Sequence, residues 1–139
     1  MTKDELKAVG FAKDEIERLR ETIAHLENLR ISPRITAYGT ERVQSSVQGD
    51  VSLSNLERID DLLKVYNAQL EGYLGLVERF TAMLETLNVT ERAIMKYRYW
   101  DCLKWEEIAY KINYQWSRMH EIHKGILNKI SEKERTQTD

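Results

Sequence analysis

The sequence contains few of the residues that interrupt helices or crosslink chains. It has one cysteine, one proline and six glycines in 139 residues, while 42% of the residues are hydrophobic and 32% are charged. Cys102 has no second cysteine to pair with, which excludes a disulfide within the chain and is typical of a cytoplasmic protein. The composition argues against a disordered chain and predicts a soluble, helix-rich one.

Long hydrophobic runs are also missing. No apolar stretch approaches the roughly 20 residues that a membrane-spanning helix requires. Residues 1–10 are charged throughout and do not have the apolar segment of a signal peptide. We therefore expect no membrane partner and a cytoplasmic location.

The side-chain combinations that catalysis requires are absent as well. The sequence has no Ser-His-Asp set, no pair of carboxylates in a cleft pattern and no glycine-rich phosphate loop, so we expect neither an enzyme nor a cofactor. His120, His123 and Cys102 are conceivable zinc ligands. A fourth ligand is missing and Cys102 belongs to another element, so we predict no metal site and place His123 at a boundary between helices.

A large net charge is likewise missing, because the chain carries only −2. The charge is unevenly distributed. Residues 51–89 carry three basic and six acidic side chains, whereas residues 90–139 carry ten basic and eight acidic ones. Residues 108–130 have four basic side chains and one acidic side chain. This local, weak positive field predicts modest affinity of one copy for nucleic acid.

Residues 2–30 are predicted to form one helix, because their apolar residues recur at intervals of three and four. These residues are Val9, Ala12, Ile16, Leu19, Ile23 and Leu26. We expect Pro33 to end the helix, since proline disfavours a helical residue before it. Residues 31–50 have no sustained period, and we expect a long exposed loop there or a small hairpin that pairs 34–38 with 43–47.

Residues 51–87 have the most regular pattern in the chain. Apolar residues recur every seven positions in two series, which predicts a long helix with a coiled-coil seam. The series are Leu56, Leu63, Leu70, Val77 and Leu84, and Ile59, Tyr66, Tyr73, Phe80 and Leu87. Ser52 or Ser54 can cap its start. The partner helix is residues 2–30 or their copy in another subunit, so we interpret residues 1–87 as an assembly region and expect a homodimer.

A short helix is predicted next. Asn88 and Glu91 have the spacing of a capping box, in which each side chain binds the backbone N–H of the other residue. The helix extends to Trp100, and residues 101–104 connect it to the following helix. Its buried face is expected to consist of Ile94, Met95 and Tyr97. At the end of the chain, residues 131–139 are expected to form a polar, frayed tail.

Residues 103–130 have the pattern of two short amphipathic helices joined by a tight turn. Ala109 is a small residue where the helices are expected to cross closely, and Asn113 falls at the turn position that requires a positive φ. Met119 and Ile122 are expected to pack the second helix onto the first. An ordinary helical hairpin is the alternative, but the register of these positions favours a DNA-reading helix-turn-helix.

A set of residues in 87–130 carries a resemblance to a known family. They are Leu87, Thr90-Glu91-Arg92, Tyr97-Arg98-Tyr99, Leu103, Trp105-Glu106-Glu107-Ile108-Ala109, and Met119 with Ile122. This stretch resembles the fourth conserved region of bacterial sigma factors. The layout of the whole chain is similar to phage-encoded sigma-like regulators of the autolysin-regulator (ArpU) and RinA late-gene activator type. These also have a terminal His-x-x-His, here His120 and His123.

Three features depart from that family. Its usual Ser or Thr cap before the Trp-Glu-Glu helix is Lys104 here, which forfeits about 1 kcal/mol unless Asp101 substitutes. The residue that opens the second helix is Gln115 rather than Ser, and the glycines usual at Asp101 and Cys102 are absent.

The second helix of such a motif enters the major groove of DNA with its N-terminal residues at the base edges. The residues that this selects are Gln115, Trp116, Ser117, His120, Glu121 and Lys124. Gln115 can pair with adenine, Glu121 can accept from cytosine, and Trp116 can cover a thymine methyl group or pack on a neighbouring subunit. Phosphate contacts are expected from Arg118, Lys124 and Lys111.

The sequence therefore predicts an all-α protein with an assembly region, a DNA-binding domain at residues 88–130 and a short tail. The resemblance implies a sequence-specific transcriptional regulator of a phage or prophage, located in the cytoplasm of a bacterial host. It also implies RNA polymerase as a further partner, as in the sigma region. One alternative is a DNA-packaging protein like a phage small terminase subunit, which also joins a helix-turn-helix to an oligomerising helix. The other is a helical scaffold that binds only protein.

Overall fold

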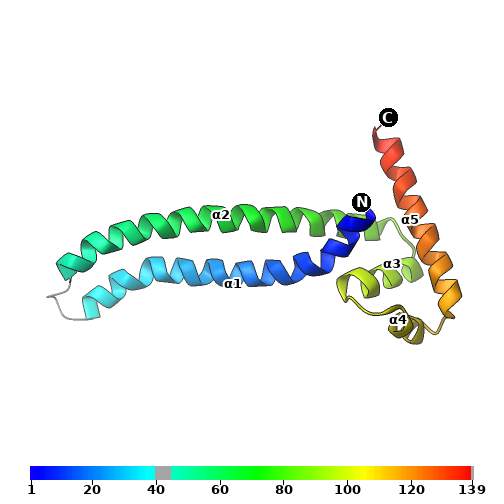
Figure 1. Cartoon of the computed structure of the whole chain (residues 1–139), viewed down its shortest axis with the longest axis horizontal. Coiled ribbons are helices and arrows are strands. Elements are labelled where there is room, and N and C mark those ends of the chain that lie inside the picture. The colour runs from blue at the N-terminus through cyan, green and yellow to red at the C-terminus, as the bar shows by residue number, and fades with distance from the viewer. Residues whose placement is uncertain (40–44, 139) are drawn as a thin grey trace. The chain divides into compact units, whose positions relative to one another are not determined.

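A computed structural model describes the backbone of residues 1–39 and 45–138, and the side chains of 1–31 and 53–135. The described residues form helices and connecting turns without strands, which confirms the all-α prediction (Figure 1). The elements in chain order are α1 (Lys3–Gly39), α2 (Ser45–Glu85), α3 (Val89–Met95), η2 (Lys96–Trp100), α4 (Trp105–Ile112) and α5 (Trp116–Thr138). None of the described helices is long and apolar enough to cross a membrane.

The chain divides into two compact units. We call Met1–Asp14 together with Tyr73–Asp139 the terminal unit, and Glu15–Gly72 the hairpin unit. The sequence placed a boundary after residue 87 and assigned everything before it to assembly. Both ends of that region instead belong to the terminal unit.

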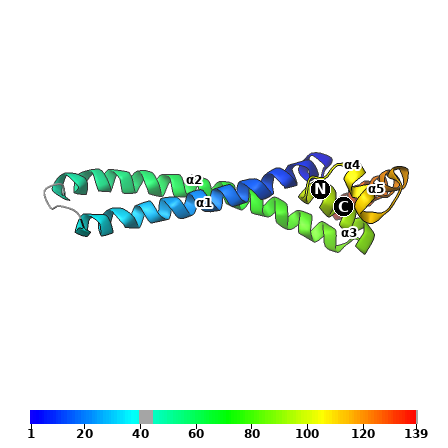
Figure 2. The same cartoon turned by 90° about the horizontal axis from the view of Figure 1, so that it is seen from below.

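In the hairpin unit, α1 and α2 run side by side in opposite directions (Figures 1 and 2). Arg30 on α1 forms an ion pair with Asp60 on α2, with 3.1 Å between Nε and Oδ1. The apolar residues of α1 predicted from their spacing are buried here at Leu19, Ile23 and Leu26. The heptad residues of α2 in this unit are half-buried, namely Leu56, Ile59, Leu63, Tyr66 and Leu70. The apolar stripe of α2 thus packs on α1 of the same chain and keeps part of its surface exposed.

The expected loop at residues 31–50 is wrong where the chain is described, because α1 continues to Gly39 and α2 begins at Ser45. Pro33 lies inside α1. A proline within a helix costs about 3 kcal/mol, but extending an existing helix requires no new nucleation, so one unfavourable residue does not end it. The alternative hairpin is also wrong, since residues 34–38 and 45–47 are helical, while 43 and 44 lie outside the described residues.

Two further boundaries differ from the sequence-based prediction. Ser52 and Ser54 lie within α2, several residues after its start, and therefore do not cap it. Residues 131–138 continue α5 as regular helix instead of forming a frayed tail. The ammonium group of Met1 forms an ion pair with Glu134 in this last part of α5, which gives the extended helix a tertiary contact.

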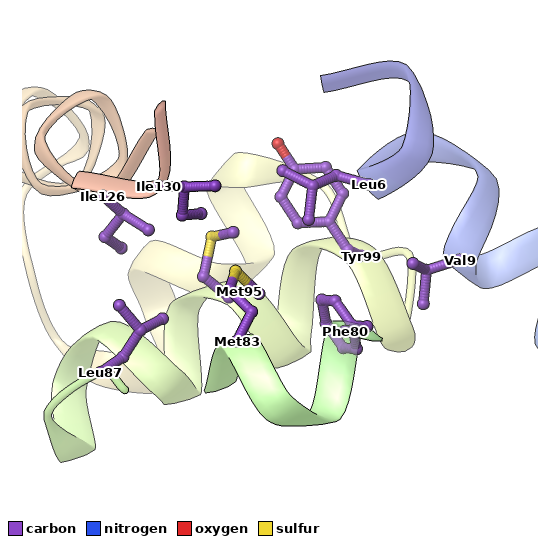
Figure 3. Packing of buried hydrophobic residues seen from close by; sticks show 9 residues of the cluster. All are labelled: Leu6, Val9, Phe80, Met83, Leu87, Met95, Tyr99, Ile126 and Ile130. Atoms are coloured by element: carbon purple, nitrogen blue, oxygen red, sulfur yellow. The ribbon is translucent and has the colours of Figure 1, made fainter. Parts of the chain in front are cut away.

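The core of the terminal unit is assembled from both ends of the chain (Figure 3). Its members are Leu6 and Val9 on α1, Phe80 and Met83 on α2, Leu87, Met95 on α3, Tyr99 on η2, and Ile126 and Ile130 on α5. Burial of one such aliphatic or aromatic side chain contributes about 1.5–3 kcal/mol. The first two turns of α1 are therefore part of the same hydrophobic core as α5.

Candidate nucleic-acid interface

The start of α3 is fixed by the predicted capping box, which is confirmed. Glu91 N donates to Asn88 Oδ1 at 2.9 Å, and Asn88 N donates to Glu91 Oε1 at 3.2 Å. Lys129 on α5 also donates to Glu91 Oε2 at 2.9 Å, and this hydrogen bond lowers the pKa of the Glu91 carboxyl. The cap therefore links α3 to α5 as well as satisfying backbone donors.

The helical segment formed by α3 and η2 ends in a π-turn, which is followed by a residue in the left-handed conformation. Asp101 N donates to Lys96 O at 3.0 Å, a bond across five residues, and Leu103 N donates to Tyr97 O at 2.9 Å. Cys102 has a φ of 59°, which is in the left-handed region that glycine adopts at the lowest cost. The sharp turn thus forms without glycine.

The turn between α4 and α5 has the predicted left-handed residue. Asn113 has φ 57° and ψ 42°. The backbone N–H groups of Asn113 and Tyr114 both donate hydrogen bonds to Ala109 O. The positive φ predicted for Asn113 is confirmed. At the other end of α4, the N-cap residue Lys104 makes no side-chain hydrogen bond to the helix start.

Helices α4 and α5 each bury at least one apolar side chain completely. Ile108 on α4 and Met119 on α5 are completely buried. Ala109 on α4 is half-buried, and Ile122 on α5 is half-buried and packs against the core of the terminal unit. This packing and the short turn fix the N-terminal end of α5 relative to α4.

Most of the residues expected to face DNA are exposed. They are Lys111, Gln115, Trp116, Ser117, Arg118, Glu121 and Lys124. Two of the cations lie near aromatic rings, with Lys111 Nζ 5.3 Å from the Tyr97 ring centroid and Arg118 Cζ 5.5 Å from that of Tyr114. Such contacts at exposed sites are worth about 0.5–1 kcal/mol, so they orient the cations without preventing other contacts.

His120 differs from the other candidates because its ring is half-buried among aromatic rings. Its centroid lies 3.9 Å from that of Trp116 and 4.7 Å from that of Trp105. The Nε2 atom is buried and has no hydrogen-bond partner among the described residues. This removes one of the two nitrogens with which His120 was expected to face DNA. Trp116 packs on His120 of its own chain, yet 56% of its surface stays exposed.

His123 lies between helices, as predicted. Its Nε2 is 2.7 Å from the Tyr99 hydroxyl on η2, and its ring packs edge-on against Trp105 at 4.7 Å between centroids. Burial lowers the pKa of His123 to about 4, with smaller electrostatic contributions from His120, Lys3 and Arg98. The imidazole is therefore neutral at pH 7. Within the described part of the chain, no three His, Cys, Asp or Glu side chains gather as a metal site.

A hollow with a volume of about 480 Å³ lies beside these rings and was not predicted from the sequence. Its lining comes from α1, η2, the turn after it, α4 and α5, all within the terminal unit. The lining residues are Lys3, Lys7, Arg98, Tyr99, Cys102, Trp105, His120 and His123. Sequence reasoning missed it because Lys3 and Lys7 are separated from the rest by about ninety residues and have the spacing of an ordinary exposed helix face.

Comparison with protein-family models, curated proteins and solved structures finds no match to this chain.

Proposed function

We propose that this protein is a sequence-specific DNA-binding transcriptional regulator in which α4 and α5 act as a helix-turn-helix. The observation that carries the proposal is the left-handed residue Asn113 between two helices, of which α4 buries Ile108 and α5 buries Met119 completely. This combination holds two helices at a tight turn and leaves the first residues of α5 exposed. A helix presented in this way has the form that a major groove accepts.

The chemistry of the exposed residues suits base reading and phosphate binding. The Gln115 amide can donate to and accept from one adenine, and Glu121 can accept from the amino group of cytosine. The cations Lys111, Arg118 and Lys124 suit phosphates on either side of the groove. Because the interface has few positive charges, one copy binds weakly, and a dimer that engages two half-sites binds more tightly.

The similarity of layout to phage-encoded sigma-like regulators supports a phage or prophage regulator that acts in a bacterial cytoplasm. By the resemblance to sigma region four, RNA polymerase is a second partner of residues 88–130. The hairpin unit then serves assembly, since α2 keeps exposed apolar surface next to the face that covers α1. A protein of this kind requires no cofactor.

The proposal is tested on duplexes selected from fragmented genomic DNA by the purified protein. Arg118→Ala with Lys124→Ala should weaken binding to every duplex and lower the slope of log K against log salt by about two. The matched control is Arg58→Ala with Lys64→Ala, which removes the same charge from exposed positions of the hairpin unit. Equal gel-shift affinity of both double variants and the unmodified protein would exclude this face.

A second variant separates base reading from phosphate binding. Gln115→Ala should change the preference at one base pair, by about 1–3 kcal/mol, and leave the salt dependence unchanged. Selection from a random library, with sequencing of the bound duplexes, measures that preference. An unchanged preferred sequence would remove Gln115 from the reading residues.

A further inference from the structure

The hollow of the terminal unit has a strongly one-sided charge. Three of the residues that line the hollow are cations at neutral pH, namely Lys3, Lys7 and Arg98. None of the lining residues carries a carboxylate. Among the described residues no carboxylate forms an ion pair with Lys3 or Lys7. Several like charges around one concave space raise the local concentration of anions.

Most of the other lining residues are aromatic. Trp105 has the Arg98 guanidinium 4.7 Å from its ring centroid and two imidazoles at the same distance. Arg98 is held in place because its Nη1 donates to Leu103 O at 3.0 Å. The cation and the aromatic surface are thus fixed beside each other before any ligand arrives, which lowers the cost of ordering the site.

The two imidazoles differ in what they offer a ligand. His123 Nε2 is already engaged with the Tyr99 hydroxyl. His120 Nε2 is buried and has no partner in the part of the chain that the structure describes. A buried polar atom without a partner costs about 1–3 kcal/mol, so a ligand or a water that supplies one is favoured at this position.

We propose that this hollow binds a phosphate monoester whose other part is a planar ring. The phosphate is held by Lys3, Lys7 and Arg98, and the ring packs on Trp105. The volume of about 480 Å³ lies in the usual range for small-molecule sites, roughly 300–1,000 Å³, and exceeds what a bare phosphate fills. Apart from His120, the site uses none of the residues assigned to DNA binding, so it does not depend on DNA binding.

Phenyl phosphate and phenol are suitable probes, the second lacking the phosphate. The ring protons of the three histidines are followed by NMR in the full chain without DNA, in a buffer free of phosphate. His120 and His123 line the hollow, whereas His25 lies in the hairpin unit and serves as an internal control. Phenyl phosphate should shift the signals of His120 and His123 in a saturable manner and leave His25 unchanged. Phenol should produce no saturable shift.

Lys3→Gln with Lys7→Gln should raise the dissociation constant for phenyl phosphate by about tenfold, since both are exposed and their loss removes charge without disturbing the core. Lys64→Gln with Lys96→Gln removes the same charge elsewhere and should bind like the unmodified protein. Absence of saturable binding, or equal affinity of both double variants, overturns the proposal.

A further titration identifies the source of the phosphate. If a short DNA duplex displaces phenyl phosphate from the histidine signals, the hollow takes a phosphodiester of the DNA backbone, and the monoester proposal is overturned. If both bind together, the occupant is a free phosphorylated molecule. Phenyl phosphate should bind equally to the Arg118→Ala, Lys124→Ala variant, so failure of the DNA-binding proposal would leave this result intact.

Discussion

His123 has an environment that differs strongly from that of a free side chain. Its neighbours are the Tyr99 hydroxyl, the Trp105 ring and the titratable groups of His120, Lys3 and Arg98. With a pKa of about 4 in the folded protein and 6.5 as the ordinary value, it takes up a proton more readily in the unfolded chain. Unfolding therefore binds a proton between these two pH values.

It follows that the free energy of unfolding should fall as the pH drops from 6.5 to 4, by up to about 3 kcal/mol, and should be constant above pH 6.5 as far as this residue is concerned. Urea unfolding followed at several pH values measures it. His123→Gln should remove most of this slope, whereas His25→Gln, at an exposed position, should keep it. A slope that is the same in all three proteins would contradict the prediction.

Asn113 and Cys102 both have a positive φ, but the sequence predicted this conformation only for Asn113. Asn113 was predicted because asparagine adopts a positive φ at lower cost than most residues, and because the neighbouring apolar spacing required a turn there. Cys102 adopts almost the same φ, yet cysteine has no such preference, so the sequence contained no local sign of it. The conformation of Cys102 is imposed by the π-turn and the packing around it.

At the scale of elements, the unexpected feature is the start of α1. The spacing of its apolar residues predicted a helix but not its partner, and the same pattern suits an assembly helix. Contact with the η2 turn is made possible by Gly10, where a Cβ atom would overlap Cys102 Sγ and lie 3.2 Å from Tyr99 O. A pairing of this kind between distant segments cannot be read from one sequence.

Gly10→Ala should therefore destabilise the terminal unit, even though alanine is the better helix former, by about 1–3 kcal/mol from overpacking. Cys102→Gly removes the overlapping sulfur, so the double variant should recover much of the loss. The control is Gly72→Ala, where nothing lies within 4 Å of the added Cβ and helix propensity should raise stability. Thermal unfolding of the unmodified protein, Gly10→Ala, Cys102→Gly and the double variant provides a double-mutant cycle. Additive changes in the free energy of unfolding would show that positions 10 and 102 do not interact.

The heptad pattern of α2 left open whether its partner helix belongs to the same chain or to another copy of the molecule. Within the hairpin unit, α1 covers part of the stripe of α2. Leu62 and Val65, three residues apart, remain 43% and 52% exposed next to it. The sequence could not distinguish these outcomes, because heptad spacing is the same for both partners.

We expect a homodimer formed through this remaining apolar surface. Leu62→Glu with Val65→Glu should weaken it by more than about tenfold without unfolding the hairpin, since both side chains are already exposed. Asn67→Glu with Ala68→Glu adds the same charge at exposed polar or small positions and should leave the dimer intact. Light scattering measures the mass of each protein. A monomeric unmodified protein would contradict the prediction, and a ring of many copies would favour the DNA-packaging alternative.

The placement of the aromatic residues makes the two units optically distinct. All three tryptophans, Trp100, Trp105 and Trp116, belong to the terminal unit, and Glu15–Gly72 has none. Tryptophan fluorescence therefore reports only on the terminal unit, while circular dichroism records the helices of both. If the two signals change at the same denaturant concentration, the units unfold as one cooperative body. If the fluorescence changes separately, its midpoint gives the stability of the terminal unit without any added label.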